Sequence, residues 1–189
     1  MEKDHWAGQC YSLDHGTHGE NELMTQLALI SVYDTATPEK HMYERFLFDL
    51  LKNRKPWESV SHKKMPTYDE HVNFVRSKPY KKWYIIDYKG PVGAIYLTNN
   101  NEIGIFIERH EQKRGFGSKS LDMLIEDSPD VEYFYANIGA FNSRSLAFFC
   151  MKGFIYDNQS YEDEKLLQYT YRFKNPAFVL PIPNRSSVD

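Results

Sequence analysis

The sequence lacks any apolar run near the roughly 20 residues that cross a bilayer, and residues 1–5 lead into polar sequence instead of an apolar signal core. It has only two cysteines, Cys10 and Cys150, which are too few for a disulfide framework and too far apart for a local metal motif. His15 and His18 lie close together, but no third ligand accompanies them. These absences predict a cytoplasmic protein with reduced thiols, no membrane span and no metal.

An excess of charge of one sign is also missing. The chain has 23 Lys and Arg against 26 Asp and Glu, which gives a net charge of −3, so no overall field draws it to nucleic acid or to anionic lipid. Hydrophobic residues make up 41% and aromatic residues 15%, which excludes disorder throughout. We therefore expect one globular domain in the 189 residues, with neither nucleic acid nor membrane as a partner.

Hydrophobic periodicity and turn signals predict a mixed α/β (α+β) fold, with about seven strands, mostly antiparallel, and about four helices. Thr37 and Pro38 begin the first helix, and Thr67 with Glu70 forms a capping box for the second. The expected strands are Leu27–Tyr33, Trp83–Tyr88, Val92–Leu97, Glu102–Ile107, Val131–Ile138, Phe154–Tyr156 and Leu166–Phe173, with the later helices over residues 115–126 and 142–152.

The segments outside these elements set the domain boundaries. Residues 1–26 show no sustained periodicity and are interpreted as an N-terminal arm. Residues 175–189 hold three of the nine prolines and end in polar sequence, which is typical of an extended tail. The domain is therefore expected over residues 27–174.

The most informative stretch is Gln112-Lys113-Arg114-Gly115-Phe116-Gly117-Ser118, between an apolar strand and an amphipathic helix. Its glycines allow close approach of a ligand, and the N–H groups of the first helical turn can bind a pyrophosphate. Lys113 and Arg114 add charge at the rim. The stretch is neither a P-loop nor a dinucleotide fingerprint, because it has no Gly-Lys-Ser/Thr ending and no third glycine. It therefore predicts a phosphate-rich cofactor other than ATP or NAD.

This segment resembles the Gln/Arg-x-x-Gly-x-Gly/Ala signature of the GCN5-related N-acetyltransferases, with Gln112, Gly115 and Gly117 in register. A second stretch, Asn142 to Phe154, is similar to the Asn-x-x-Ala/Ser-x-x-Leu/Phe-Tyr-x-x-x-Gly-Phe helix and turn of the same family. The order and spacing of the elements agree from about Leu27 to Phe173. The resemblance thus covers most of the chain.

The resemblance implies a sheet splayed between its fourth and fifth strands, with acetyl-CoA as cosubstrate in the opening. The implied cofactor-binding residues follow the family motifs along the fourth strand, the glycine loop and the later helix. They are Ile105, Phe106, Ile107, Gln112, Lys113, Arg114, Gly115, Phe116, Gly117, Ser118, Asn142, Ser145 and Phe149. The backbone N–H of Ile107 is the implied oxyanion donor.

The chain departs from the family at the positions of the general acid and the general base. Many members have a tyrosine acid seven residues after the motif asparagine, and Phe149 stands there. Asn137 stands where the ribosomal-protein alanine acetyltransferases have a base glutamate. The remaining catalytic candidates are Glu102, His62 and His71, and a water relay without a dedicated base stays open.

The expected reaction is transfer of acetyl to the primary amine of a small molecule. The segment Trp57 to His71 combines an aromatic side chain with hydroxyls, histidines and acids, which suits an amino sugar or a nucleotide-linked amino sugar. Two alternatives remain: a protein amine or polyamine as acceptor, or a degenerate member that binds CoA without turnover. The exposed aromatics are compatible with a homodimer.

Overall fold

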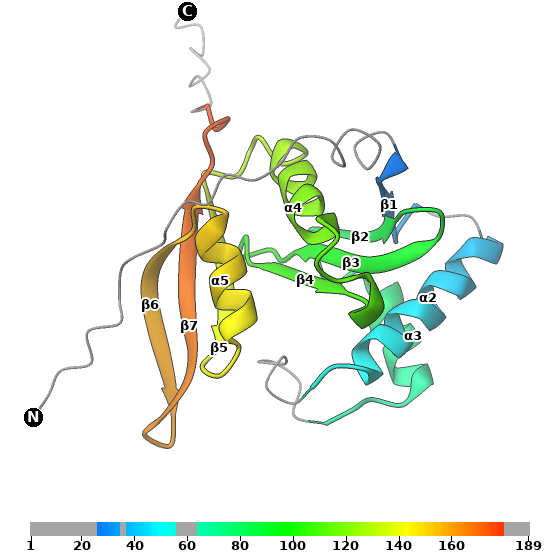
Figure 1. Cartoon of the computed structure of the whole chain (residues 1–189). Coiled ribbons are helices and arrows are strands. Elements are labelled where there is room, and N and C mark those ends of the chain that lie inside the picture. Colours follow the sequence, from blue (N-terminus) through cyan, green and yellow to red (C-terminus); the bar gives the residue numbers. More distant parts are fainter. Residues whose placement is uncertain (1–25, 35–36, 56–63, 180–189) are drawn as a thin grey trace, which may run out of the picture.

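The computed structural model describes residues 26–34, 37–55 and 64–179. Within these ranges the strands and helices follow one another in the order expected (Figure 1). In chain order they are β1 Ala28–Ser31, α2 Thr37–Lys52, α3 Tyr68–Arg76, β2 Lys82–Asp87, β3 Pro91–Leu97, β4 Ile103–Ile107, the 3₁₀ helix η2 Arg109–Glu111, α4 Phe116–Glu126, β5 Tyr133–Gly139, α5 Ser143–Met151, β6 Ile155–Glu162 and β7 Lys165–Lys174.

The strands form two antiparallel sheets. The first has the order β1-β2-β3-β4, and the second has the order β5-β7-β6, so that β7 lies between its two neighbours. Between β4 and β5 the described residues form only one isolated parallel bridge, Glu102 to Tyr135. Beyond this bridge the two strands part, which confirms the splay expected between the fourth and fifth strands.

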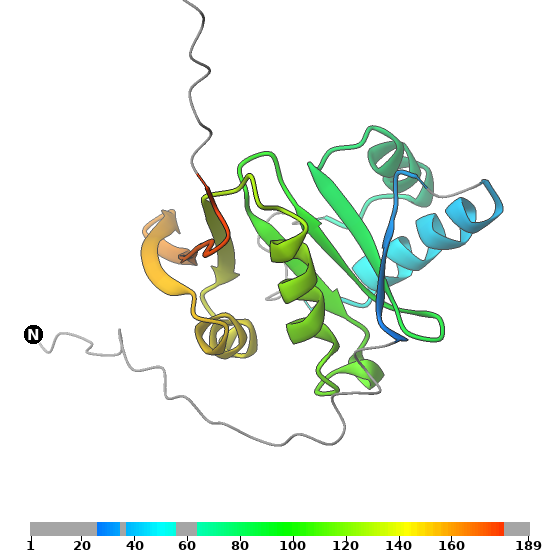
Figure 2. The ribbon, with the colours of Figure 1, turned by 90° about the horizontal axis from the view of Figure 1, so that it is seen from above.

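Helices cover both faces of the first sheet. Figure 2 shows α4 on one face and α2 with α3 on the other. On the α2 side, Tyr43, Leu47 and Leu50 recur at a spacing of three to four residues and pack against Ile85 and Ala94 of the sheet. The neighbouring residue Ile86 points the other way, because successive strand side chains alternate, and it joins the core beneath α4.

The second core runs from α4 into the opening between the sheets. Phe116, Leu121 and Leu124 of α4 are fully buried there, beside Phe134 and Ile138 of β5. The same cluster includes Phe149 of α5 and Phe154, which lies between α5 and β6. Apolar packing across the opening therefore holds the two sheets at a fixed separation.

The two helices on the same face of the first sheet, α2 and α3, are joined by an ion pair. Glu44 of α2 is 1% exposed and accepts from Arg76 of α3 at 2.8 and 3.1 Å, and His41 lies 3.3 Å from the same carboxylate. The hydrogen bonds from Arg76 hold the pKa of Glu44 below its ordinary value. This contact fixes α3 against α2.

One expectation from sequence, the length of the sixth strand, needs revision. The strand expected at Phe154–Tyr156 is longer, because the polar run of Ile155–Glu162 pairs with β7 along an exposed edge where no apolar pattern is required. Asn175, the first residue of the expected tail, is 2% exposed and donates through Nδ2 to the carbonyls of Ser128 and Val131. The packed part of the chain therefore extends at least to Asn175.

Candidate active site

The larger of two neighbouring cavities has a volume of about 640 Å³ and opens between β4 and the start of α5. Its lining is rich in basic side chains, and it includes the β4 residues from which the family resemblance implies cofactor contacts. The lining residues are Leu50, Lys52, Asn53, Arg54, Lys55, Ile105, Phe106, Ile107, Glu108, Arg109, His110, Gln112, Asn142 and Arg144. We call this the cofactor cavity.

Gln112 supports one wall of the cofactor cavity. Its Nε2 donates to the carbonyl of Ile107 at 2.9 Å, and its Oε1 accepts from Arg144 of α5. Along residues 105–107, β4 pairs with β3 on one side only, and its other edge borders the cavity. The motif glutamine therefore ties the end of β4 to α5 at the place where an extended ligand can lie beside the strand.

The glycine loop has the geometry that a phosphate site requires. Gly115 adopts φ +82 and precedes α4, whose first-turn N–H groups receive no side-chain cap from it. A Cβ built on Gly117 would make only ordinary van der Waals contacts, the nearest at 3.6 Å to Phe148, so the backbone there lies close to α5 and β4. The loop residues 113–118 are not part of the cofactor cavity's lining, and they extend the site toward α4.

The other side chains of this loop have structural contacts. Phe116 is 1% exposed and packs against Tyr88 with ring centroids 5.0 Å apart, so only its backbone can reach a ligand. Arg114 pairs with Glu111 and lies over the Phe116 ring. Ser118 accepts from Lys152 at 3.1 Å, which places a cation beside the loop that sequence analysis did not identify.

Of the motif residues at and within α5, Asn142 and Phe149 line different cavities and Ser145 lines neither. Asn142 lines the cofactor cavity and also caps α5, since its Oδ1 accepts from the N–H of Ser145 at 3.1 Å. Phe149 is buried in the core of the opening and lines the smaller cavity instead. Its ring packs against Phe148 and Phe154. At this position the chain offers an apolar wall and no proton.

The smaller cavity, of about 250 Å³, lies on the α2 and α3 side of β4. Its lining combines several aromatic side chains with aliphatic and polar ones. The lining residues are Leu47, Leu51, Arg54, Lys64, Pro66, Glu70, His71, Phe74, Tyr80, Trp83, Ala94, Tyr96, Ile103, Gly104, Ile105, Phe106, Asn137 and Phe149. We call this the acceptor cavity.

The aromatic wall of the acceptor cavity is a tight ring cluster. Tyr80 and Tyr96 stack with centroids 4.1 Å apart and planes 5° apart, and the Trp83 ring meets Tyr80 edge-on at 4.9 Å. Burial raises the pKa of both tyrosines, while the positive charge of Arg54 opposes the rise. Both hydroxyls therefore remain protonated at neutral pH.

The floor of the acceptor cavity depends on Gly104. Gly104 of β4 pairs with Tyr96 of β3, and the tyrosine ring crosses directly above it. A Cβ at position 104 would overlap the Tyr96 ring. Position 104 must therefore be glycine for Tyr96 to take its place in the wall.

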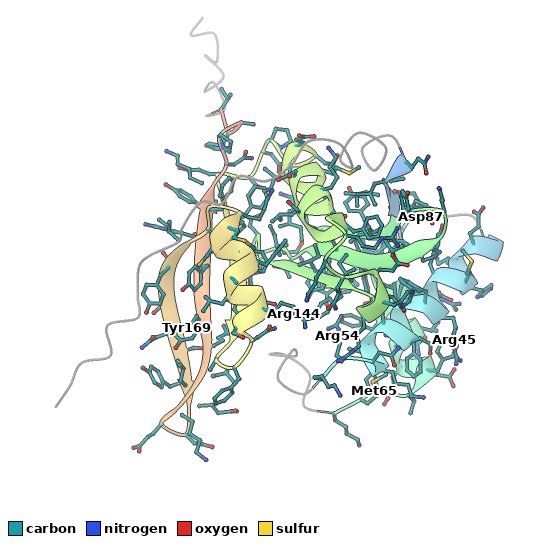
Figure 3. The ribbon with its side chains drawn as sticks, in the orientation of Figure 1. Arg45, Arg54, Met65, Asp87, Arg144 and Tyr169 are labelled. Carbon is teal, nitrogen blue, oxygen red and sulfur yellow. The ribbon has the colours of Figure 1, made fainter. Side chains whose placement is uncertain are left out.

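Arg54 joins the two cavities. It lines both of them, together with Ile105 and Phe106, and its guanidinium carbon lies 3.1 Å from the centroid of the Phe106 ring. In Figure 3, Arg54 at the end of α2 and Arg144 on α5 flank the opening from its two sides. Arg54 therefore lies where the two cavities share their lining.

The structure brings together two residues that sequence analysis weighed separately. Asn137 donates through Nδ2 to Glu102 at 2.8 Å, and its Oδ1 accepts from Thr170 at 2.8 Å. Thr98 also contacts Glu102, because the Glu102 N–H donates to its hydroxyl at 3.0 Å. Glu102 does not line the acceptor cavity itself but reaches it through Asn137.

The two histidine candidates differ in what the structure says of them. His71 is 5% exposed, lines the acceptor cavity and packs against Phe48 with centroids 5.5 Å apart. His62 lies outside the described residues.

Among the described residues, no helix has the length and apolar character that a bilayer crossing requires, and no three His, Cys, Asp or Glu side chains come together as metal ligands.

Sequence analysis missed the residues that complete both cavities. Arg54 follows α2 with no motif around it, and Tyr80, Trp83 and Tyr96 read as ordinary strand and turn aromatics. Arg144 lies within the stretch Asn142 to Phe154 that resembles the family motif, but the motif does not predict that its side chain lines the cofactor cavity. The remaining cavity residues come together only through the pairing of β2, β3 and β4 with the helices α2 and α3.

Comparison with known proteins rests on structure alone, because no family model and no curated protein matches the sequence. Similar solved structures include RimL, a ribosomal alpha-N-protein acetyltransferase, in complex with coenzyme A, with TM-score 0.63 and 19% identity over 81% of this chain and 96% of that chain. A spermidine N-acetyltransferase from Vibrio cholerae, in complex with CoA and spermine, has TM-score 0.62 and 16% identity over 78% and 94%. An acetyltransferase from Thermus thermophilus has TM-score 0.60 and 18% identity over 79% and 97%.

These likenesses establish the architecture. The chain has the fold of the GCN5-related N-acetyltransferases, as its two motifs predicted. The similarity spans nearly the whole length of each of these proteins.

Proposed function

We propose that this protein is an acetyl-CoA-dependent N-acetyltransferase that transfers the acetyl group to a primary amine of a small molecule by direct attack on the thioester. The observation that carries the proposal is the meeting of the cofactor and acceptor cavities at Ile105, Phe106 and Arg54. A thioester held along β4 would have its acyl end at this junction. An amine in the acceptor cavity could then reach it.

The residues present fit acetyl-CoA. The free edge of β4 at residues 105–107 can pair with an extended amide chain, and the first-turn N–H groups of α4 can bind a pyrophosphate beside Gly117. Basic side chains in the lining, such as Arg109 and Arg144, add charge-assisted hydrogen bonds. When bound, acetyl-CoA supplies an activated acyl group, and Ile107 remains the candidate N–H donor to its carbonyl oxygen.

The amine must be neutral before it attacks, so a proton acceptor is needed. Glu102 is the first candidate, because Asn137 connects its carboxylate to the acceptor cavity. His71 is the second, and a water relay between cavity and carboxylate is the third. Phe149 cannot protonate the leaving thiolate. A thiol pKa near 8.5 makes the thiolate a tolerable leaving group without help.

For the acceptor we propose an amino sugar or a nucleotide-linked amino sugar. The lining combines the rings of Tyr80, Trp83 and Tyr96 with polar groups, which suits the mixed apolar and hydroxyl surface of a sugar, and Asn137 can bond its hydroxyl groups. The second candidate is a protein amine or polyamine. It is favoured by the likeness to the RimL and spermidine N-acetyltransferase structures.

The test is release of free thiol from acetyl-CoA in the presence of amino sugars, their nucleotides, peptides and polyamines. Release that depends on an amino sugar supports the proposal, and release with peptides or polyamines alone moves the acceptor to the second candidate. No release with any acceptor, together with retained binding of CoA, would identify a degenerate member that lacks turnover.

A rate profile against pH then separates the bases. Glu102→Gln should remove the acidic limb of the profile if Glu102 accepts the proton, while His71→Gln should leave that limb in place. Asn137→Ala is the matched variant, because it removes the contact at 2.8 Å and retains the carboxylate. Unaltered profiles in both Glu102→Gln and His71→Gln would assign proton removal to water.

A further inference from the structure

The polar groups of the acceptor cavity are mostly hydrogen-bond donors and cations. Arg54 and Lys64 are cationic, and Tyr80, Tyr96 and Trp83 each bring an O–H or N–H donor. Among the described residues of the lining, Glu70 is the single carboxylate. Its Oε2 already accepts from the Thr67 N–H at 2.7 Å and from the Thr67 hydroxyl at 2.9 Å, in the capping box of α3.

Trp83 gives a second observation that points to a ligand. It is 6% exposed and lines the acceptor cavity, and its Nε1 has no hydrogen-bond partner among the described residues. Buried N–H groups normally have a partner, because leaving one unpaired is unfavourable. A ligand oxygen in the cavity would satisfy this donor.

Arg54 carries the charge of the cavity to the point where the two cavities meet. Its guanidinium lies against the Phe106 ring, and both residues line both cavities. Arg54 shares the lining of the acceptor cavity with Tyr80 and Tyr96. The positive charge therefore lies beside the acceptor's binding space and beside the proposed site of transfer.

We infer that the acceptor amine also carries an anionic oxygen group, a carboxylate or a phosphate, which Arg54 and Trp83 bind within the acceptor cavity. The inference rests on the proposed function, because it names the class of acceptor that the proposed reaction uses. Since Arg54 also borders the site of transfer, the amine and the anion are only a few bonds apart in the acceptor.

The same charge has a second effect that suits the reaction. A fixed guanidinium disfavours a second cation nearby, so it favours the neutral form of the acceptor amine, which is the nucleophile. A polyamine, which carries several positive charges and no anion, offers no anionic group to the guanidinium of Arg54 and meets its repulsion. The cavity therefore discriminates by charge as well as by shape.

The test uses matched pairs of acceptors that differ in one anionic group: glucosamine with glucosamine 1-phosphate, and leucinamide with leucine. For the full chain, kcat/KM is measured by thiol release, and calorimetry measures binding of each compound to the CoA-loaded protein. We expect the anionic member of at least one pair to be favoured by about tenfold or more. The phosphate pair and the carboxylate pair distinguish the two sources of the anion.

Arg54→Gln should bring the ratio of kcat/KM between the anionic and the neutral acceptor close to one. Trp83→Phe, which retains the ring and removes the Nε1 donor, should lower this ratio by a smaller factor. Arg45→Gln is the matched control, because Arg45 lies on α2 away from the opening and pairs with Asp49 at the surface (Figure 3). Its ratio should equal that of the unaltered protein. If Arg54→Gln does not fold, Arg54→Lys and Trp83→Phe replace it.

Equal or reversed ratios in both pairs, better use of spermidine than of either anionic compound, or an unchanged ratio in Arg54→Gln would overturn the inference. So would a failure of both anionic compounds to bind or react. A preference for the anion in binding, without thiol release, would support this inference and reject the proposed activity. The two failures are therefore distinguishable.

Discussion

The two cavities that meet at Phe106 are built from the chain in different ways. The cofactor cavity draws on three short stretches within residues 50–55, 105–112 and 142–144. The acceptor cavity takes one or a few residues from each of α2, α3, β2, β3, β4, β5 and α5. A site made of contiguous stretches has a sequence signature, whereas a site assembled across a sheet has none until the sheet is formed.

The two cavities also differ in what they can discriminate. The cofactor cavity is larger and lined by several cations and by strand backbone, which can bind phosphates and amide groups irrespective of the acceptor. The acceptor cavity is smaller, aromatic and tightly packed, so its shape depends on each ring in the wall. We expect substitutions to separate the two functions accordingly.

The largest effect should come from Gly117→Glu on the cofactor side. The added carboxylate and its bulk would occupy the loop surface and repel phosphate at the start of α4. At a concentration of 100 times Kd, acetyl-CoA should stabilise the unaltered protein by about 2.7 kcal/mol. Thermal unfolding with and without acetyl-CoA should show that Gly117→Glu loses this stabilisation.

Gly117→Ala is the matched control for that experiment. Its methyl group would make only ordinary contacts, the nearest at 3.6 Å from Phe148, so much of the stabilisation should remain. Equal stabilisation of Gly117→Glu and the unaltered protein would contradict the assignment of the phosphate site.

On the acceptor side, Gly104→Ala should have the next largest effect. The methyl group would displace the Tyr96 ring, at a cost to the free energy of unfolding of about 1 to 3 kcal/mol, as for other overpacked sites. The acceptor KM should rise while the dissociation constant of acetyl-CoA remains close to that of the unaltered protein. A Gly104→Ala variant with unchanged stability and unchanged acceptor KM would show that the cavity floor adapts.

A smaller effect is expected where α3 is held against α2. Glu44→Gln should lower Tm by several degrees at pH 7, because it removes the charged partner of Arg76 from a buried position. The pKa of Glu44 is lowered in the folded state from its ordinary value of 4.5, so the stabilisation is fully present above that value. As the pH falls below about 4.5 toward the lowered pKa, the difference in Tm between the two proteins should shrink.

Asp49→Asn serves as the control on the same helix. Asp49 pairs with Arg45 where both side chains are largely exposed, so its loss should change Tm very little. A difference between Glu44→Gln and the unaltered protein that stays constant down to pH 3 would contradict the role given to the Glu44 carboxylate.

The smallest effect should follow Gln112→Ala. The variant loses the hydrogen bond from Nε2 to the Ile107 carbonyl and the contact with Arg144, while the backbone of β4 still pairs with β3. Loss of about 1 kcal/mol would raise the dissociation constant of acetyl-CoA by roughly fivefold. Calorimetry can measure this, and Gln159→Ala on the exposed β6 edge is the control.

Much of the architecture could be predicted from sequence because local patterns decide it. The Thr67 capping box begins α3 as expected, and the alternation of Ile85 and Ile86 between two cores follows from strand geometry. The length of β6 could not be predicted, because Ile155–Glu162 is an exposed edge strand with polar residues on it. β6 pairs with β7 as a hairpin, and no apolar pattern in the sequence predicts the length of that pairing.

The candidate site was predictable only in part. Gln112, Asn142 and the glycine loop are close in sequence to the elements that they serve, and the structure places Gln112 and Asn142 on the cofactor cavity. The contact between Glu102 and Asn137 spans 35 residues and depends on where β4 and β5 part. Arg54 gains its position from the Phe106 ring, which no spacing along the chain encodes.

The overlap between position 104 and the ring of Tyr96 has a consequence for genetics. Because one residue can have a side chain only if the other gives up its ring, the two positions form a reciprocal pair across β3 and β4. Tyr96→Ala vacates the space that the Gly104→Ala methyl group needs, so the losses of stability from the two substitutions should be less than additive in the double variant. Among distant homologues we expect the two positions to covary in size, so that an aromatic residue at 96 accompanies glycine at 104.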